Sequence, residues 1–328
     1  MNFSKKICTL ALTTVLSSIA ITIVPSEILG DEINQNNATH SREKRWSAEA
    51  PNNVEQSTHL WMAQNAINIM ARDQDAVSRR NAVNFFNQPN LKRAFEQGLY
   101  DADHLDEFNN GGMGSIYIDG YIKGGWKSHF YNPDTGKNYK GETKPTAKTE
   151  GTKYFELAGD YYKNGNQEKA MYFLGVATHY FTDITQPMHA ANFTNVELSD
   201  LDSLKFHSVF EDYVTEIQEH YKVDDALGEY NILLTNKCSE YSYDAGDWIH
   251  AAAIIAKAQA PNIIRPEVFR ENYGHILVLP DFSIQADETW KRDPKIQEAI
   301  AKSLIEGQRM TAGFLNVWFE KFVGNTPS

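Results

Sequence analysis

The stretch His179-Tyr-Phe-Thr-Asp183-Ile-Thr-Gln-Pro-Met-His189-Ala-Ala-Asn192 places three side chains of metal-binding type within eleven residues. His179 and Asp183 are four residues apart, so on a helix they share one face. Pro187 is expected to break that helix, and His189 follows directly after the break. The stretch therefore predicts a metal site at the end of a helix.

A second pair with metal-binding side chains, His207 and Glu211, repeats the four-residue spacing. The resulting five nitrogen and oxygen ligands exceed the four that one tetrahedral zinc ion takes. A single His is usually an ordinary surface or core residue, and a His–Asp pair at this spacing is often only a side-chain pair. However, five such residues within 33 positions, joined by a Pro-Met-His turn, favour a hydrolase with more than one zinc ion.

Three other segments carry candidate ligands. Ser57-Thr58-His59 is expected to open the first helix, with Ser57 or Thr58 as its cap. Asp101-Ala-Asp103 follows the second helical region, and Ser128-His129-Phe130 ends a glycine-rich stretch. Histidines interpreted as ordinary surface or core residues are His220, His250 and His275.

The first 45 residues are not expected to belong to the fold. Lys5 and Lys6 precede an uncharged, mostly apolar stretch, Ile7 to Val24, and no stop-transfer flank follows it. This pattern is typical of a secretory signal peptide. We predict a signal peptide at 1–30, a propeptide at 31–45 that a protease removes between Arg45 and Trp46, and one domain at 46–328. The protein is therefore expected to be secreted and extracellular.

Composition limits the partners. The chain has a net charge of −12, whereas a protein that binds many phosphates carries a basic surface. We therefore expect no nucleic-acid partner. The charge does not exclude a nuclease that holds one phosphate on metals. Cys8 would leave with the signal peptide, so Cys238 would remain alone and no intramolecular disulfide is expected.

The pattern of apolar residues predicts an all-α fold, a single-domain helical bundle. Apolar residues recur at spacings of three and four, as in Leu60, Ala63, Ile67 and Met70. Further helices are expected at 75–100 with a break near Pro89, and at 149–163, 167–184, 204–221, 243–260 and 295–322. Glycines predict a long loop over 101–148, and 222–242 and 261–294 are expected to be irregular or mixed.

Several runs besides His179–Asn192 are distinctive: Trp46-Ser-Ala-Glu49, Thr58-His59-Leu-Trp61, Tyr100-Asp-Ala-Asp103, Ser128-His129-Phe-Tyr-Asn-Pro-Asp134 and Arg309-Met-Thr-Ala-Gly-Phe-Leu. In these runs, and over nearly all of 46–328, the sequence resembles the zinc-dependent bacterial phospholipases C. That family includes phosphatidylcholine-preferring secreted enzymes and the catalytic domain of alpha-toxin. The resemblance implies an all-helical domain with three Zn²⁺ ions in a cleft.

The resemblance also implies a ligand set for each zinc ion. The sets are the backbone amine and carbonyl of Trp46 with His59 and Asp183 for the first ion, Asp183, Asp103, His129 and His179 for the second, and His189, His207 and Glu211 for the third. Asp183 would bridge the first two ions. The amine of Trp46 can bind zinc only after cleavage has freed it, because before cleavage that nitrogen belongs to an amide. The uncleaved precursor is therefore expected to be weakly active or inactive.

The implied activity is hydrolysis of a phospholipid at a membrane surface to diacylglycerol and a phosphorylated headgroup. Asp103 has two candidate roles, zinc ligand and general base, which need not exclude one another. The resemblance implies that Glu49 and Trp126 form a choline site. The alternative interpretation of Glu49, a solvated surface residue, has equal weight. His104 stands where some relatives have Tyr, and 103–129 is longer than in compact relatives, so a broader headgroup range is expected.

Other possibilities remain open at this point. Apolar and aromatic residues of the long loop either contact the bilayer or pack on the domain; they are Phe108, Ile116, Tyr117, Ile118, Tyr121, Ile122 and Trp126. A single-strand-specific nuclease with three zinc ions is the rival enzyme, and a zinc protein with a dead site is the rival outside the enzymes. We expect a monomer.

Overall fold

The computed structural model describes residues 53–72, 77–109, 117–118, 121–122, 126–194, 206–224, 242–265 and 289–324. All of them lie within one compact unit, Glu43–Ser328. The predicted signal peptide and propeptide, with Trp46 and Glu49, lie outside the described residues. Helices make up most of the described part, and its one sheet is a pair of two-residue strands. The predicted all-α fold class is therefore confirmed.

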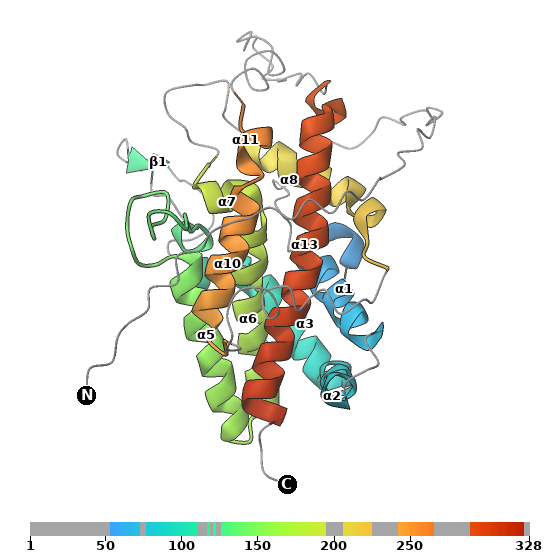
Figure 1. Cartoon of the computed structure of the whole chain (residues 1–328). Coiled ribbons are helices and arrows are strands. Elements are labelled where there is room, and N and C mark those ends of the chain that lie inside the picture. Colours follow the sequence, from blue (N-terminus) through green and yellow to red (C-terminus); the bar gives the residue numbers. More distant parts are fainter. Residues whose placement is uncertain are drawn as a thin grey trace, which may run out of the picture. The chain divides into compact units, whose positions relative to one another are not determined.

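The described chain contains long helices joined by short helical turns (Figure 1). The α-helices are α1 Thr58–Arg72, α2 Val77–Phe86, α3 Pro89–His104, α4 Asp106–Asn109, α5 Ala147–Lys163, α6 Gln167–Thr185, α7 Pro187–Ala191, α8 Phe206–Ile217, α10 Ala245–Lys257, α11 Ala260–Ile263 and α13 Pro294–Phe319. Shorter elements are the 3₁₀ turns η1 Val54–Gln56, η2 Lys127–His129, η4 Gln218–Tyr221 and η6 Thr289–Arg292, the π-helical turn η7 Glu320–Gly324, and the antiparallel strands β1 Tyr117–Ile118 and β2 Tyr121–Ile122.

Helix α6 is the centre of the bundle. It packs against α3 and α5, and also against α1, α10 and α13 (Figure 1). All its residues from Leu174 to Thr185 are buried, as expected for a helix surrounded by others. Asn166 caps its start, and the helix ends at Gln186, whose backbone is extended. His179 and Asp183 are therefore held inside the core.

The contact between α3 and α6 depends on two glycines. A Cβ atom added to Gly98 would lie 1.9 Å from the carbonyl oxygen of Tyr172, and one added to Gly175 would lie 2.1 Å from the carbonyl oxygen of Phe95. Each distance is far below any real carbon–oxygen contact, so the two backbones approach as only glycine permits. This close approach fixes the end of α3 against α6.

One sequence expectation is wrong at the end of α3. The loop predicted from residue 101 starts later, because α3 continues to His104 and places Asp103 in its last turn. Pro89 starts the helix, and a buried apolar face continues through Leu99 and Ala102. The polar run around Asp103 concealed this continuation. Phe108 is buried at 2 % exposure, so it packs on the domain.

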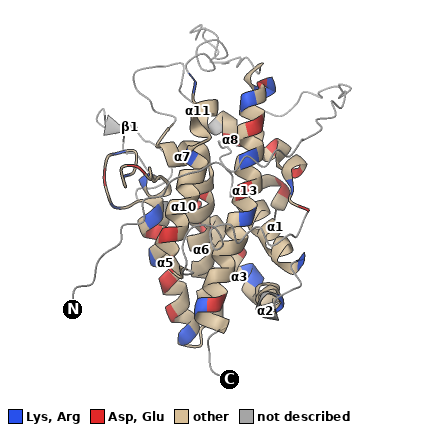
Figure 2. Cartoon of the chain, in the orientation of Figure 1, with Lys and Arg blue, Asp and Glu red and all other residues tan. Residues whose placement is uncertain are grey.

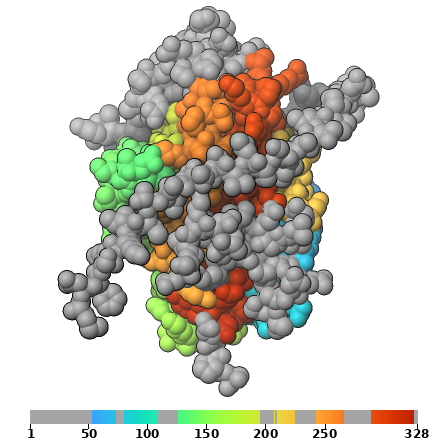
Figure 3. Space-filling view, in the orientation of Figure 1, coloured from blue at the N-terminus to red at the C-terminus, as the bar shows by residue number. Residues whose placement is uncertain are grey.

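The first and last described helices lie side by side. Helix α1 contacts α13, and both reach the surface on the same face in the space-filling view (Figure 3). Along α5 and α13, Lys and Arg residues alternate with Asp and Glu rather than gathering on one face (Figure 2). Within the described residues, no helix has both the length and the apolar character needed to cross a bilayer.

Candidate metal centre

Eight of the nine predicted ligands converge at one end of the central helices. They are His59 in the first turn of α1, Asp103 in the last turn of α3, His129 at the end of η2, His179 and Asp183 on α6, His189 on α7, and His207 and Glu211 on α8. The ninth, Trp46, lies outside the described residues. All eight are buried except Asp103, whose side chain is 15 % exposed.

Asp183 lies at the middle of the cluster. Its Oδ2 is 2.7 Å from Nδ1 of His129 and 3.4 Å from Nε2 of His179. Its Oδ1 is 3.4 Å from Nδ1 of His189 and 3.7 Å from Nε2 of His59. One carboxylate therefore faces four imidazole rings that come from four separate elements.

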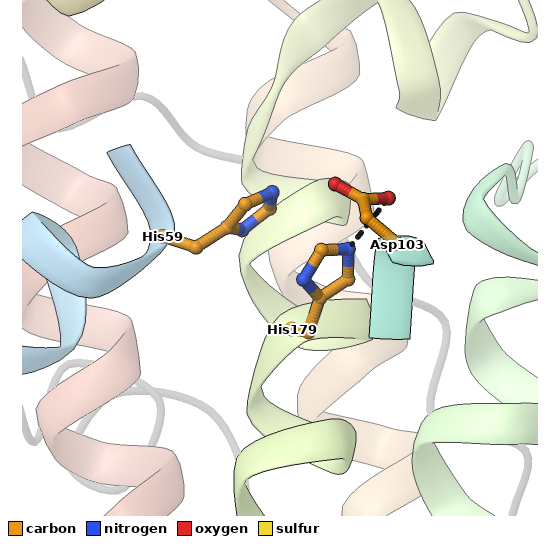
Figure 4. Close-up of side chains that lie close together, drawn as sticks. All are labelled: His59, Asp103 and His179. Atoms are coloured by element: carbon orange, nitrogen blue, oxygen red, sulfur yellow. Dashed lines mark ion pairs between the residues drawn. The ribbon is translucent and has the colours of Figure 1, made fainter. Parts of the chain in front are cut away.

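Asp103 closes the cluster from the α3 side. Its Oδ1 is 3.3 Å from Nε2 of His179 and 3.6 Å from Nδ1 of His129. Figure 4 shows the carboxylate of Asp103 turned toward the ring of His179, with the ring of His59 beside it. The rings of His59 and His179 stack with their centroids 3.9 Å apart. Helices α1, α3 and α6 thus direct one side chain each to a common point.

A second group of ligand atoms lies between α7 and α8. Oε1 of Glu211 is 2.9 Å from Nε2 of His207 and 3.2 Å from Nε2 of His189. The two Nε2 atoms are 3.1 Å apart. His207 and Glu211 share one face of α8, and the break before α7 turns His189 toward them. The four-residue spacing and the Pro-containing turn thus act together.

The ring orientation of three histidines is fixed by main-chain carbonyls. Nδ1–H of His179 donates to the carbonyl of Leu99 (2.9 Å), that of His189 to the carbonyl of His129 (3.0 Å), and that of His207 to the carbonyl of Phe193 (2.7 Å). A carbonyl can only accept, so in the neutral ring the proton lies on Nδ1 and the Nε2 lone pair is available to a metal.

His59 is oriented by a side chain instead. Its Nδ1 lies 2.6 Å from Oγ1 of Thr182, whose own hydroxyl proton has the carbonyls of Thr178 and His179 within 3.0 Å. The hydroxyl therefore accepts from His59 and leaves Nε2 of that ring for a metal. Sequence analysis missed Thr182 and also Gln186, which contacts Glu211. Both stand within the central run, but their spacing alone carries no ligand signal.

The pKa values of the clustered side chains are strongly shifted, because the groups are buried and lie close to one another. Burial, together with the nearby His179, lowers the pKa of His59 to about 3. Burial also opposes charge on His179, but Asp103 and Asp183 together raise its pKa to about 9. Burial alone would raise the pKa of Asp103, whereas His179 and His129 hold it well below its usual value.

The donor atoms fit zinc. Three groups have one ligand atom from each member within 4.8 Å of the others: His59 with Asp103 and His179, His129 with His179 and Asp183, and His189 with His207 and Glu211. Buried imidazoles and carboxylates in sets of three are the ligands of zinc sites. The last group has the same members as the third set implied by the sequence. In the other two groups His179 is the shared residue, whereas the resemblance assigns sharing to Asp183.

The pKa of His179 predicts a pH effect on the metal-free protein. Because that pKa rises from 6.5 to about 9 on folding, its stabilising contribution is fully present below pH 6.5 and is lost as the pH rises through 9. We expect the free energy of unfolding to fall by roughly 3 kcal/mol across this window, measured by chemical denaturation. His179→Gln is the control, since it removes the titrating group. An equal fall in both proteins would contradict the assignment.

Two of the three predicted substrate-binding residues, His104 and Trp126, lie within the described residues. Neither is a member of the three groups of candidate metal ligands found there. The ring of His104 stacks on Tyr100 at 3.7 Å, and its Nδ1–H donates to the carbonyl of Tyr100 at 2.7 Å. Trp126 adopts a left-handed backbone conformation with φ of 60°, and its carbonyl accepts from the N–H of His129 at 2.9 Å. Trp126 therefore shapes the turn that presents His129.

The histidines interpreted as ordinary residues lie outside the three groups. His220 is exposed, and Nδ1 of His250 is 2.8 Å from the hydroxyl of Tyr131. His275 lies outside the described residues. The interpretation therefore agrees with the structure for the two that can be located.

This geometry, an all-helical bundle with buried zinc-type ligands at one end, is accompanied by clear similarity to known proteins. The model of a family described as zinc-dependent phospholipase C matches residues 58–259. The chain belongs to this family of hydrolases.

Individual relatives agree. A phospholipase C of Bacillus cereus is 34 % identical over 278 residues, which cover 85 % of this chain and 86 % of the relative. A phospholipase C of Listeria monocytogenes is 29 % identical over 327 residues, or 98 % of this chain and 99 % of the relative.

A solved structure shares the fold. The alpha-toxin of Clostridium absonum aligns with a TM-score of 0.55 and 21 % identity, over 83 % of this chain. The chain spans 65 % of the length of that toxin structure. At this identity the likeness shows the common helical fold.

Proposed function

We propose that this protein is a secreted phospholipase C that uses three zinc ions. It would hydrolyse the glycerol-side phosphodiester of phosphatidylcholine, and of other phospholipids, to diacylglycerol and a phosphorylated headgroup. The observation that carries the proposal is the convergence of eight buried or half-buried ligands in three groups within a chain of this family. The relatives named phospholipase C support the reaction.

The chemistry needs a nucleophilic water, neutralised phosphoryl oxygens and a stabilised leaving alkoxide. Zinc, when bound, lowers the pKa of bound water to about 7 and neutralises charge on the phosphate. The chain's own part is to hold the ligand atoms in place. Asp183 is buried at 2 % exposure, so substrate does not reach it. Its role would be to bind the metal and to orient the neighbouring imidazole rings.

Asp103 has the most exposed side chain of the eight described ligands, at 15 %. Its lowered pKa keeps it ionised at neutral pH, as both a ligand and a proton acceptor must be. Asp103 is therefore the residue best placed to accept a proton from water at the edge of the cluster.

The two roles of Asp103 are separable by Asp103→Asn. An amide oxygen can still bind metal but cannot accept a proton at neutral pH. As a general base, Asp103 should show a loss of turnover of about 10²–10⁴-fold at unchanged zinc content. Elemental analysis of zinc beside a turnover assay would check this. Loss of zinc in parallel with turnover would assign Asp103 the ligand role alone.

The substrate is tested by comparing phosphatidylcholine, phospholipids with other headgroups and single-stranded DNA, using protein that begins at Trp46. We expect hydrolysis of several phospholipids and none of DNA. Hydrolysis of DNA alone would establish the rival nuclease. No turnover on either substrate after zinc reconstitution would leave a zinc protein with a dead site.

Glu49 and Trp126 are the residues proposed to contact the headgroup. An aromatic face such as that of Trp126 attracts a quaternary ammonium by a cation–π interaction. Trp126 is half-buried and lies three residues before His129, whose backbone N–H donates to its carbonyl. His104 is proposed as a neighbour of Asp103 that broadens headgroup choice.

Processing before Trp46 is the proposed activation step. A free amine with a pKa of about 7.7–8.0 gives up its proton to a competing metal near neutral pH, whereas an amide nitrogen does not. Protein with one extra residue before Trp46 should therefore bind less zinc and turn over more slowly than protein beginning at Trp46. Zinc content and turnover are the two measurements. Full activity with a full zinc complement in the extended protein would refute this step.

We propose that the processed enzyme acts as a monomer.

A further inference from the structure

Gln186 joins two of the ligand-bearing helices. It is completely buried, at 0 % exposure, and stands between the last residue of α6 and the first of α7. Its backbone N–H donates to the carbonyl of Asp183 at 3.0 Å. Its side-chain oxygen accepts from the N–H groups of Met188 and His189, the latter at 3.2 Å. One end of this amide therefore fixes how α7 leaves α6.

The other end of the amide reaches the ligand of a different helix. Nε2 of Gln186 donates to Oε1 of Glu211 at 3.1 Å and lies 3.3 Å from Nε2 of His207. Oε1 is the same oxygen that faces His207 and His189. The position of this oxygen relative to the start of α7 is thus set through a single side chain.

We propose that Gln186 is a positioning residue for the zinc ion bound by His189, His207 and Glu211. The inference rests on the proposed function, because it takes these three residues as ligands. Gln186 acts on two of them at once: it orients the backbone of His189 and holds the carboxylate of Glu211. It does not itself bind the metal.

The residue type follows from the two contacts. An amide supplies an acceptor to the N–H groups of α7 and a donor to Glu211. A Glu in its place would bring a second carboxylate to about the same distance from Glu211, where like charges repel. An apolar residue would leave the N–H groups of α7 and the oxygen of Glu211 without a partner inside the core. Only an amide of this length satisfies both.

A purely structural role, the capping of α7, is the competing explanation. Gln186→Ser separates the two, because serine is a favoured cap but is too short to reach Glu211. Asn166→Ala is the matched control: Asn166 caps the other end of α6 by accepting from the N–H of Lys169 at 3.1 Å, and its side chain is exposed. The control removes a cap far from any ligand.

The experiment measures zinc per chain in the full processed protein, equilibrated against a series of zinc–chelator buffers. His207→Ala identifies which ion belongs to this group. In Gln186→Ser, we expect that ion to be held about 10–100-fold more weakly, as is typical when a partner of a ligand is lost. The other ions should be retained as in the unmodified protein, and Asn166→Ala should retain all of them.

Retention of this ion by Gln186→Ser to within twofold of the unmodified protein would overturn the inference, because the cap alone would then suffice. Circular dichroism and thermal unfolding of the metal-free variants report whether each has folded. Gln186→Thr, which is also a favoured cap and is likewise too short to reach Glu211, replaces the serine variant under the same criterion if the latter does not fold. Full zinc in His207→Ala would instead show that the proposed ligand set is wrong, a separate failure.

Discussion

Asp183→Asn is expected to abolish turnover and to remove zinc from the protein. The change keeps the shape of the side chain but removes a negative charge that four imidazole rings face at 2.7–3.7 Å. Coulombic attraction to Asp183 is also a cause of the raised pKa values of His179 and His189. Loss of turnover should exceed the roughly 10–100-fold that follows loss of a partner one step removed from the metal.

Zinc per chain and turnover are measured together for this variant. Asp101→Asn is the matched control, because it makes the same change in an Asp near the end of α3, two residues before Asp103. The carboxylate of Asp101 accepts from Gln97 and Tyr172 rather than facing the imidazole cluster. The control should keep both zinc and turnover. An Asp183→Asn protein with full zinc and full turnover would show that the carboxylate is not a ligand.

Gly175→Ala is expected to destabilise the fold, although alanine is the better helix former. The added Cβ would lie 2.1 Å from the carbonyl oxygen of Phe95, which is backbone and cannot rotate away. Helices α3 and α6 must then separate, at a cost of about 2–3 kcal/mol, typical of overpacking. Because Asp103 is on α3 and His179 on α6, turnover should also fall.

Thermal unfolding of the zinc-loaded protein measures the effect, and a lower midpoint by several degrees is expected. Gly307→Ala is the control within α13: its Cβ would lie 2.9 Å from the sulfur and 3.1 Å from the terminal methyl of Met62, atoms of a flexible side chain. That variant should be affected much less. A Gly175→Ala protein with an unchanged midpoint would mean that the close approach of α3 and α6 is not required.

The ligands were accessible to sequence reasoning because a metal imposes residue types and spacings. Spacing singled out His207 and Glu211, four apart on α8, and His189 after the Pro break. The resemblance to the family implied that they form one set, and the structure brings their ligand atoms together. The role of each residue as a ligand stays a prediction. Asp103 was predicted as a site residue but placed in a loop, because the polar residues around it hid the last turn of α3.

What sequence reasoning missed are interactions that do not depend on residue type or on spacing. Gly98 and Gly175 look like weak points in helices until their backbones are seen in contact. Thr182 and Gln186 are common polar residues whose function depends on which helix lies opposite. No spacing rule brings residue 186 to residue 211, since tertiary packing sets that distance.

The main-chain acceptors of the histidine rings affect how this site tolerates mutation. Replacement of the side chain at position 99 or 193 leaves the carbonyl that orients His179 or His207 in place. Any side chain that packs well at these positions is therefore tolerated, because the orientation of the metal-facing nitrogen does not depend on it. By contrast, His59 and Glu211 depend on the side chains of Thr182 and Gln186, so a single nucleotide change could disturb them. The positions of His59 and Glu211 are thus more sensitive to substitution of their partners than the positions of His179 and His207.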